Sequence, residues 1–277
     1  MALNLLDITA NNNDLTNSGA TEVTTNLPFA ESSKAVDIDN ASSQYLSAAD
    51  SASLSLSGDF TIEFWIKFNS LPATGQSYAI VSKTDFDVSN NNKAFRVDFE
   101  KNALDVTRLV AEINETGNDT TRDLVRYNWA PDLDTWYHVA VTCDISQASA
   151  TTFEIFINGS SVGNGTMAVS GNCASINNST EPLHLGRARN GASYIQYGDF
   201  KLDDIRIWND IRTPTEIANN YNVELVGNEA NLVTYWPFEA FISGPVNLKT
   251  YNTNATANIK TINTNPIANV KSLNTNT

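Results

Sequence analysis

The chain has 277 residues, a length that permits one large β domain or two smaller domains. Its formal net charge of −14 would repel the phosphate backbone of a nucleic acid, so nucleic acid is excluded as a partner. Hydrophobic residues make up 41% of the chain, enough for a core, yet no segment approaches the roughly 18 apolar residues of a membrane span. The N-terminal residues lack both a basic region and a long apolar run, so we expect neither a signal peptide nor membrane insertion.

Alternating apolar residues predict short β-strands along most of the chain. The clearest is Asp59–Phe68, whose even-numbered residues are all apolar, the pattern of a strand with one face packed on a core. Phe95–Phe99 repeats this pattern, and Asn158-Gly159 between two apolar runs predicts a two-residue hairpin. Residues 1–34 are polar, and we expect from them an early edge strand and a long connection. Further strands are expected at Val36–Asp39, Gln44–Leu46, Tyr78–Lys83, Leu109–Ile113, Asp123–Asn128, Trp136–Cys143, Phe153–Ile157, Leu183–Gly186 and Leu232–Trp236.

A strand followed by a short helix is predicted between Phe200 and Tyr221. Ile205 and Ile207 share one face of the strand, and Asp203 falls on the same face, so we expect its carboxylate to point toward the interior. An ionised acid in that position needs a partner such as a cation, an arginine or several amides. Thr213-Pro214-Thr215-Glu216 then supplies the residues of a helix start, and apolar residues recur at helical spacing over about two turns.

Three segments carry a resemblance to a known family, the LamG-like (laminin G or pentraxin type) domains of the concanavalin A-like lectin/glucanase superfamily. The family's closing signature is similar to LDDIRIWNDIRTPTEIANNY (Leu202–Tyr221). Its opening strands are similar to AVDIDNASSQYLSAADSASLSLSGDFTIEFWIKF (Ala35–Phe68), and its central hairpin to TWYHVAVTCD…TFEIFINGSSVGNGT (Thr135–Thr166). The resemblance and the short predicted strands together imply an all-β fold, a two-sheet antiparallel jelly-roll sandwich with one short helix, over residues 1–243.

The C-terminal segment, residues 244–277, has a different pattern. From Asn247 it repeats with a period of eleven, as NLKTYNTNATA, NIKTINTNPIA and NVKSLNTNT. Two apolar residues per unit cannot form a core, so the units must pack on the sandwich, stack on one another or join copies from other subunits. The alternative is a disordered low-complexity tail. Similar repeats occur on phage and other virion structural proteins with LamG-like domains, and this resemblance implies a role in attachment or assembly.

Catalysis is not expected from this sequence. A retaining glucanase needs two carboxylates about 5–5.5 Å apart, and the superfamily's glucanases place them in a Glu-x-Asp-x-x-Glu pattern that is missing from the sequence. The nearest pair, Asp98 and Glu100, lacks the third acid, and we interpret it as part of a solvated face. His138 and His184 lie in separate predicted strands and are interpreted as structural.

The resemblance implies one structural calcium ion. Many related domains hold this ion between an acid just after the opening strand and another in the closing strand, and the matching residues are Asp39 and Asp203. Asn40 stands where the family has a glycine, so two surface or salt-bridged acids remain the alternative. A second acidic loop, with Asp85 and Asp87, begins like an EF-hand loop, but Arg96 occupies the twelfth position, where a glutamate belongs.

Sugar recognition would use an aromatic platform beside amides and carboxylates. Tyr127 and Trp129 lie where a predicted strand enters a proline-containing loop and could stack on a sugar ring. Separately, the loop with Asp85 and Asp87 could hold a weakly bound ion or a glycan hydroxyl. The alternatives are a loop anchored by a buried tryptophan and a solvated acidic loop.

The chain has two cysteines, Cys143 and Cys173, and the sequence allows either a disulfide or two thiols. Cys143 shares the apolar face of its strand, so we expect it in the core.

The leading hypothesis is a non-enzymatic, calcium-stabilised binding or adhesion module for a glycan or cell-surface polysaccharide. Its expected setting is a virion surface or another extracellular assembly, with the repeats contacting other virion or assembly proteins and with homo-oligomers allowed. The alternatives are a structural decoration protein without a ligand and, less favoured, a glycoside hydrolase.

Overall fold

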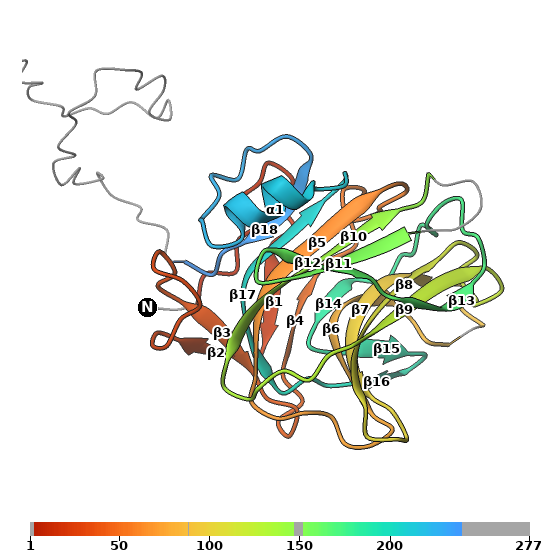
Figure 1. Ribbon diagram of the computed structural model, residues 1–277, viewed down its shortest axis with the longest axis horizontal. Helices are drawn as coiled ribbons and strands as arrows, with labels where there is room; N and C mark the ends of the chain where they lie inside the picture. The colour runs from red at the N-terminus through yellow and green to blue at the C-terminus, as the bar shows by residue number, and fades with distance from the viewer. Residues whose placement is uncertain (1–2, 88, 147–151, 240–277) are drawn as a thin grey trace, which may run out of the picture. The chain divides into compact units, whose positions relative to one another are not determined.

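The computed structural model describes residues 3–87, 89–146 and 152–239, which form eighteen strands and one helix (Figure 1). Most strands belong to two large antiparallel sheets. Sheet A contains, in spatial order, β1 (Leu15–Ser18), β4 (Tyr45–Ala48), β14 (Leu183–Leu185), β6 (Ser77–Thr84), β7 (Lys93–Lys101), β8 (Thr107–Asn114), β9 (Arg122–Asn128) and β13 (Thr166–Ser170). Sheet B contains β12 (Ser160–Asn164), β11 (Thr152–Ile157), β10 (Trp136–Asp144), β5 (Phe60–Phe68), β17 (Phe200–Trp208), β3 (Ala35–Ile38) and β2 (Thr21–Val23), with β18 (Leu232–Trp236) also paired to β17. The other elements are the hairpin of β15 (Ala188–Asn190) and β16 (Ser193–Ile195) and the helix α1 (Pro214–Asn220).

The apolar faces predicted from the sequence meet between the two sheets. Phe60 on β5 lies 5.8 Å, centroid to centroid, from Phe95 on β7, and Phe68 lies 4.5 Å from Phe99. All four rings are almost completely buried, and burying one phenylalanine contributes about 1.5–3 kcal/mol. The prediction of an all-β sandwich of two antiparallel sheets is confirmed.

Helix α1 begins where the sequence predicts. The hydroxyl of Thr213 accepts a hydrogen bond from the backbone N–H of Glu216 (3.2 Å), and the carboxylate of Glu216 accepts one from the N–H of Thr213 (2.8 Å). Ile217 is the buried residue of the helix, and it packs against Ala140 and Phe156 on sheet B. A helix this short is unstable alone, so the capping box and this contact hold it.

The face predicted for Asp203 is wrong, because β17 contains a bulge. Asp203 lies opposite Trp65 and Arg206 lies opposite Glu63, so three steps along β17 match two steps along β5. Asp204 has a positive φ of 49° within this irregularity. The extra residue reverses the alternation, so Asp203 shares the face of Trp65 and not that of the core isoleucines.

The two cysteines are thiols. Cys143 is buried in the core as predicted, Cys173 is buried in the loop after β13, and no disulfide joins them. Burial raises the pKa of both thiols, that of Cys173 to about 12, so neither is a reactive thiolate at neutral pH.

The predicted repeat tail lies outside the described residues, and its role in attachment stays a prediction from the sequence. Within the residues that the structure describes, no helix is long and apolar enough to cross a membrane.

Candidate functional site

The structure does not bring the predicted calcium ligands Asp39 and Asp203 together. On β3, Val36 faces Leu202 and Ile38 faces Phe200, which places Asp39 four residues further along the strands than Asp203. At about 3.3 Å per residue this separates them by about 13 Å, whereas two ligands of one calcium ion lie at most about 5 Å apart. In the described residues, moreover, no group of three or more His, Cys, Asp or Glu side chains is arranged to hold a metal ion. The pair does not fit a shared ion, and calcium stays a prediction.

Each of the two acids instead has its own local surroundings. Asp39 accepts hydrogen bonds from the Ser42 hydroxyl (2.8 Å) and the Ala41 N–H (2.8 Å), which lower the pKa of its carboxyl group. Asp203 is buried and accepts a 2.6 Å hydrogen bond from the Ser32 hydroxyl. Burial, and then the charge of Asp204, raise the pKa of Asp203 well above its usual range. Asp39 is therefore a loop acid, and Asp203 is a buried acid whose pKa is raised in the folded state.

The predicted sugar-binding residues lie at two different ends of sheet A. Asp85 directly follows Thr84, which pairs with Lys93, whereas Tyr127 pairs with Leu109 near the other end of the strands. The carboxylate of Asp85 is buried and accepts hydrogen bonds from the N–H groups of Asp87 (3.0 Å) and Gly191 (2.7 Å). It therefore organises its own loop, and the four residues do not form one site.

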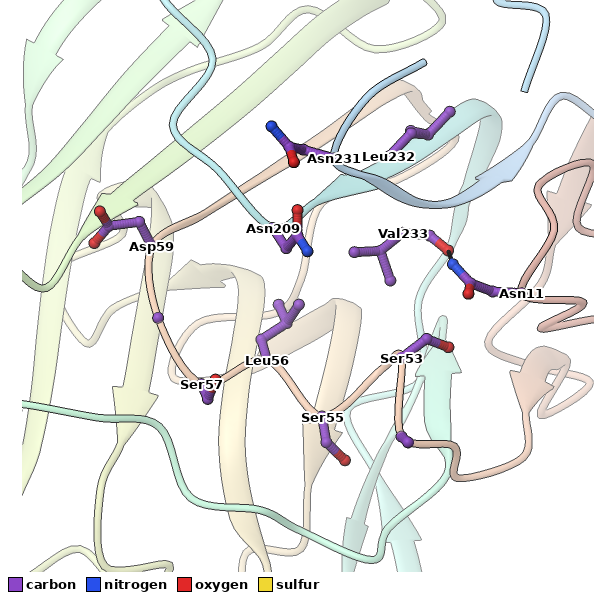
Figure 2. Close-up of a pocket in the computed structure, with 12 residues that line it drawn as sticks. Asn11, Ser53, Ser55, Leu56, Ser57, Asp59, Asn209, Asn231, Leu232 and Val233 are labelled. Atoms are coloured by element: carbon purple, nitrogen blue, oxygen red, sulfur yellow. Dashed lines mark hydrogen bonds between the residues drawn. The ribbon is translucent and has the colours of Figure 1, made fainter. Parts of the chain in front are cut away.

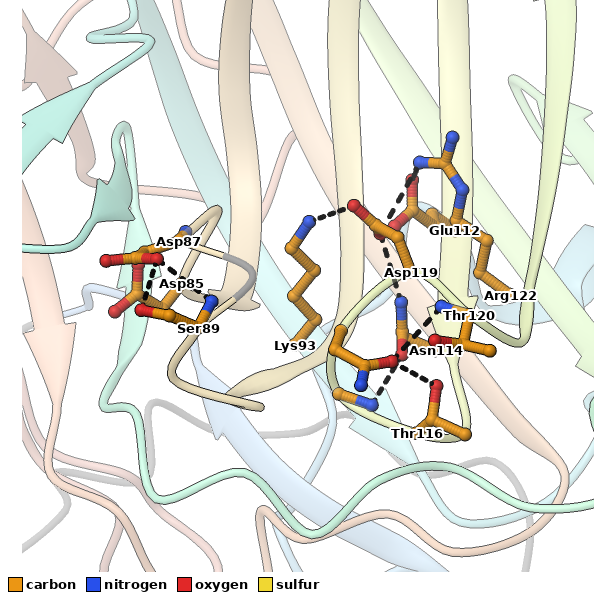
Figure 3. A network of polar contacts seen from close by, with 12 residues as sticks. Asp85, Asp87, Ser89, Lys93, Glu112, Asn114, Thr116, Asp119, Thr120 and Arg122 are labelled. Carbon is orange, nitrogen blue, oxygen red and sulfur yellow. Dashed lines mark hydrogen bonds and ion pairs between the residues drawn. The ribbon is translucent and has the colours of Figure 1, made fainter.

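Charged side chains on the outer face of sheet A pair with one another (Figure 3). Lys93 contacts Asp119, and Arg122 lies 3.5 Å from Glu112 and 3.6 Å from Asp119. Asp98, expected on a solvated face, is also fully buried on this sheet, because Arg96 pairs with it and the Phe86 ring covers Arg96 at 4.8 Å. This network satisfies its own charges, and it offers little free charge to a ligand.

Trp129 is held by other rings. Its indole lies edge-on to Phe68 (5.9 Å), Phe99 (5.7 Å) and Tyr137 (5.3 Å), so the alternative of an anchored loop fits better than a sugar platform.

Replacement of Trp129 by alanine is expected to lower the free energy of unfolding by about 2–3 kcal/mol, because the half-buried indole loses these ring contacts. Urea unfolding measures this loss, and glycan affinity should not change. Lost glycan binding at unchanged stability would instead restore the platform interpretation.

A first pocket, of about 500 Å³, lies between the segment Ser53–Asp59 and residues Asn209 and Asn231–Val233 (Figure 2). Its walls are mainly serine hydroxyls and asparagine amides, and the Asn11 amide beside it donates a 2.7 Å hydrogen bond to the Val233 carbonyl. None of the described residues that line it is aromatic. It offers polar contacts but no ring on which a sugar could stack.

A second pocket, of about 440 Å³, combines both kinds of contact, and we call it the Tyr197 pocket. Its lining contains Asn40, Gln76, Tyr78, Gln196 and Tyr197. The Tyr78 hydroxyl is fixed by the Asn40 amide (3.3 Å), whereas the Gln196 Oε1 atom is buried without a hydrogen-bond partner among the described residues. This buried acceptor costs free energy, and because it is closed to solvent it does not face the pocket.

The chain turns sharply to build this pocket. Gln196 follows β16 with a positive φ of 57°, and its carbonyl accepts the N–H of Ala79 (2.9 Å). A Cβ atom on Gly198 would lie 2.1 Å from the Phe200 ring, so only glycine fits there. The strained turn and this glycine place Tyr197 at the surface, half-buried, in the loop between β16 and β17.

Sequence reasoning missed the hairpin that leads to this pocket. Its strands have only three residues each, too few for a visible alternation. Asn190-Gly191 was the available signal, because this dipeptide favours tight hairpin turns.

Comparisons with solved structures agree with the fold. The binding domain of botulinum neurotoxin serotype G is similar at a TM-score of 0.55 and 15% identity, over 78% of this chain and 47% of that one. The binding domain of Paraclostridial Mosquitocidal Protein 1 gives 0.54 and 18%, over 79% and 52%. The binding domain of botulinum neurotoxin DC in complex with SialylT gives 0.53 and 14%, over 79% and 50%. The chain spans about half the length of these structures, and likeness at such identities concerns the fold alone.

No curated protein matches the chain. A laminin G-type family model, described as the concanavalin A-like lectin/glucanases superfamily, matches residues 40–218, which is well over half of the chain. This range includes the central hairpin and most of the opening and closing segments on which the sequence resemblance rested. The chain therefore belongs to the concanavalin A-like lectin/glucanase superfamily.

Proposed function

We propose that this domain is a non-enzymatic carbohydrate-binding module and that the Tyr197 pocket is its sugar site. The observation that carries the proposal is the combination of a half-buried tyrosine ring with amide and hydroxyl side chains around one pocket of about 440 Å³. The binding domain of a structural relative, botulinum neurotoxin DC, forms a complex with SialylT, which is consistent with a ligand of this class.

The chemistry of the pocket suits a sugar. Tyr197 is half-buried and lines the pocket, so its ring would stack on the apolar side of a pyranose held there. Asn40, Gln76 and Gln196 add amide groups that both donate and accept. Ring stacking and hydroxyl recognition would thus be supplied by neighbouring side chains.

The same lining argues for binding without hydrolysis. None of the described residues that line the pocket is aspartate, glutamate or histidine. Glycoside hydrolysis needs a carboxylic acid and a second carboxylate across the scissile bond. The pocket can therefore hold a sugar ring, but it supplies neither the acid nor the nucleophile.

Replacement of Tyr197 by alanine is expected to weaken glycan binding at least about tenfold, because truncating an aromatic anchor typically removes more than one decade of affinity. A glycan array identifies a ligand for the wild-type chain, and calorimetry then compares the two proteins.

Tyr127→Ala is the matched control, since Tyr127 is also a half-buried tyrosine but lies in β9 and packs against the core. It should leave the affinity unchanged. Loss of binding in the control alone would move the site to Tyr127, and a wild-type chain that binds no glycan would refute the proposed function.

We further propose, from the sequence alone, that the module acts on a virion surface or in another extracellular assembly.

A further inference from the structure

Arg187 is a buried cation without a counter-ion. It is only 5% exposed, and no carboxylate of the described residues lies within ion-pair distance of it, whereas the neighbouring Arg189 contacts both Asp85 and Glu181. A buried charge without a partner is costly, so such a group points to a ligand.

Two tyrosine rings cover both faces of this guanidinium. Its Cζ atom lies 3.2 Å from the centroid of Tyr45 and 3.3 Å from that of Tyr194, and the two rings are inclined by only 18°. The faces of Arg187 are therefore occupied, and only the in-plane N–H edge remains for a ligand. Tyr194, on β16, is 38% exposed and is the outer wall of this arrangement.

Neutral donors lie beside the charge. The Nε atom of Arg187 donates to Nδ1 of His184 (3.4 Å), which assigns the proton of the neutral imidazole to Nε2. This Nε2 atom and the Ser82 hydroxyl are both buried without a hydrogen-bond partner among the described residues, and the two residues are direct cross-strand neighbours. Burial, and then the charges of Arg187, Arg189 and Lys83, lower the pKa of His184 to about 3, so this imidazole is neutral at pH 7.

We propose that these residues, which we call the Arg187 cluster (Tyr45, Arg187 and Tyr194), bind the carboxylate of an acidic sugar such as a uronic or sialic acid. The inference rests on the proposed function, because it names the class of sugar that the module prefers. The free edge of the guanidinium pairs with the carboxylate, and Tyr194 moves aside to admit the ring. The hairpin that carries Tyr194 continues directly into Gln196 and Tyr197, so one segment borders both sites.

The first test uses the complete wild-type chain. The side-chain N–H signal of Arg187, assigned by its loss in Arg187→Lys, is followed by NMR during titration with sodium glucuronate, N-acetylneuraminate, sodium acetate and glucose. We expect a saturable shift with at least one acidic sugar, a weaker response to acetate and none to glucose. The two acidic sugars separate a uronate site from a sialate site. An equal response to acetate would mean a general anion site, and it would overturn the assignment to sugars.

The second test compares the affinities for an acidic glycan and its neutral counterpart. The pair is sialyllactose and lactose if the titration indicates a sialate site, and a uronate and a hexose oligosaccharide if it indicates a uronate site. Arg187→Gln should lower the affinity for the acidic glycan about tenfold or more, because a charge-assisted contact is removed. The affinity for the neutral glycan should not change. Lys67→Met is the matched control, since Lys67 is also a buried cation that has no ion pair among the described residues but lies over Trp136 on sheet B. It should change neither affinity.

The two proposals fail in different ways. If neutral glycans bind at Tyr197 while no acidic sugar shifts the Arg187 signal, the inference is wrong and the proposed function stands. If no glycan binds through Tyr197 yet acidic sugars saturate Arg187, the proposed sugar pocket is wrong and the carboxylate site stands.

Discussion

Replacement of Arg206 by methionine lowers the free energy of unfolding by about 3–5 kcal/mol, the expected cost of breaking a buried ion pair from one side. Arg206 is 1% exposed and makes two hydrogen bonds to the Asp204 carboxylate, of 2.6 and 2.8 Å. It also donates to the carbonyls of Asn220 (2.9 Å) and Val223 (2.6 Å), at the end of α1 and just beyond it. Arg206 therefore neutralises the charge of Asp204 in the bulge of β17, and its hydrogen bonds connect the chain after α1 to sheet B.

The loss is large because Asp204 stays behind. Burial raises the pKa of Asp204, and Arg206 is the group that opposes this rise. Without Arg206 the acid must either remain charged in an apolar environment or take up a proton on folding, and both outcomes cost stability at neutral pH. Methionine fills part of the volume but supplies neither charge nor hydrogen bonds.

Urea unfolding at pH 7 measures the loss of stability in Arg206→Met, and two further variants serve as controls. Arg212→Met removes a more exposed arginine that pairs with Asp210 and Glu216, so its effect should stay below about 1 kcal/mol. Asp204→Asn combined with Arg206→Met should recover part of the loss, because the buried charge of Asp204 is removed together with that of Arg206. A loss for Arg206→Met no larger than that for Arg212→Met would contradict the assigned role.

Replacement of Asp203 by asparagine is expected to stabilise the protein at neutral and alkaline pH. The folded state raises the pKa of Asp203, so the folded chain holds this proton more tightly than the unfolded chain does. The stability that this provides is complete below the unfolded pKa of about 3.9 and is lost as the pH rises through the folded pKa. Asparagine resembles the protonated acid and can still contact Ser32, which bonds Asp203 in the wild type.

The measurement is urea unfolding between pH 5 and pH 8 in EDTA. The wild type should lose stability relative to Asp203→Asn as the pH rises, with a difference of at least about 1.4 kcal/mol at pH 8, which corresponds to one unit of pKa. Asp39→Asn is the control, because the pKa of Asp39 is lowered and its substitution should not stabilise the protein.

The same experiment in calcium chloride tests the predicted ion. A calcium ion at Asp203 would need the ionised carboxylate, so calcium would stabilise the wild type and Asp203→Asn would abolish that gain. This result would contradict the protonated acid and restore the calcium prediction.

The sequence by itself determined the fold, because the alternation of apolar and polar residues is a local pattern that can be read along the chain without the tertiary structure. It identified the faces of β5 and β7 and the start of α1 at Thr213, where the capping residues lie within four positions of one another. The family resemblance rested on the same strands, and the family model matches residues 40–218.

Only the tertiary structure decided where the polar groups meet. A single extra residue at Asp204 moved Asp203 to the other face of β17, and strand register separated Asp39 from it. The rings of Tyr45 and Tyr194, residues almost 150 positions apart in the chain, meet over the two faces of Arg187. Such positions depend on bulges, register and long-range packing, which no local pattern encodes, and so the candidate sites emerged only once the sheets were assembled.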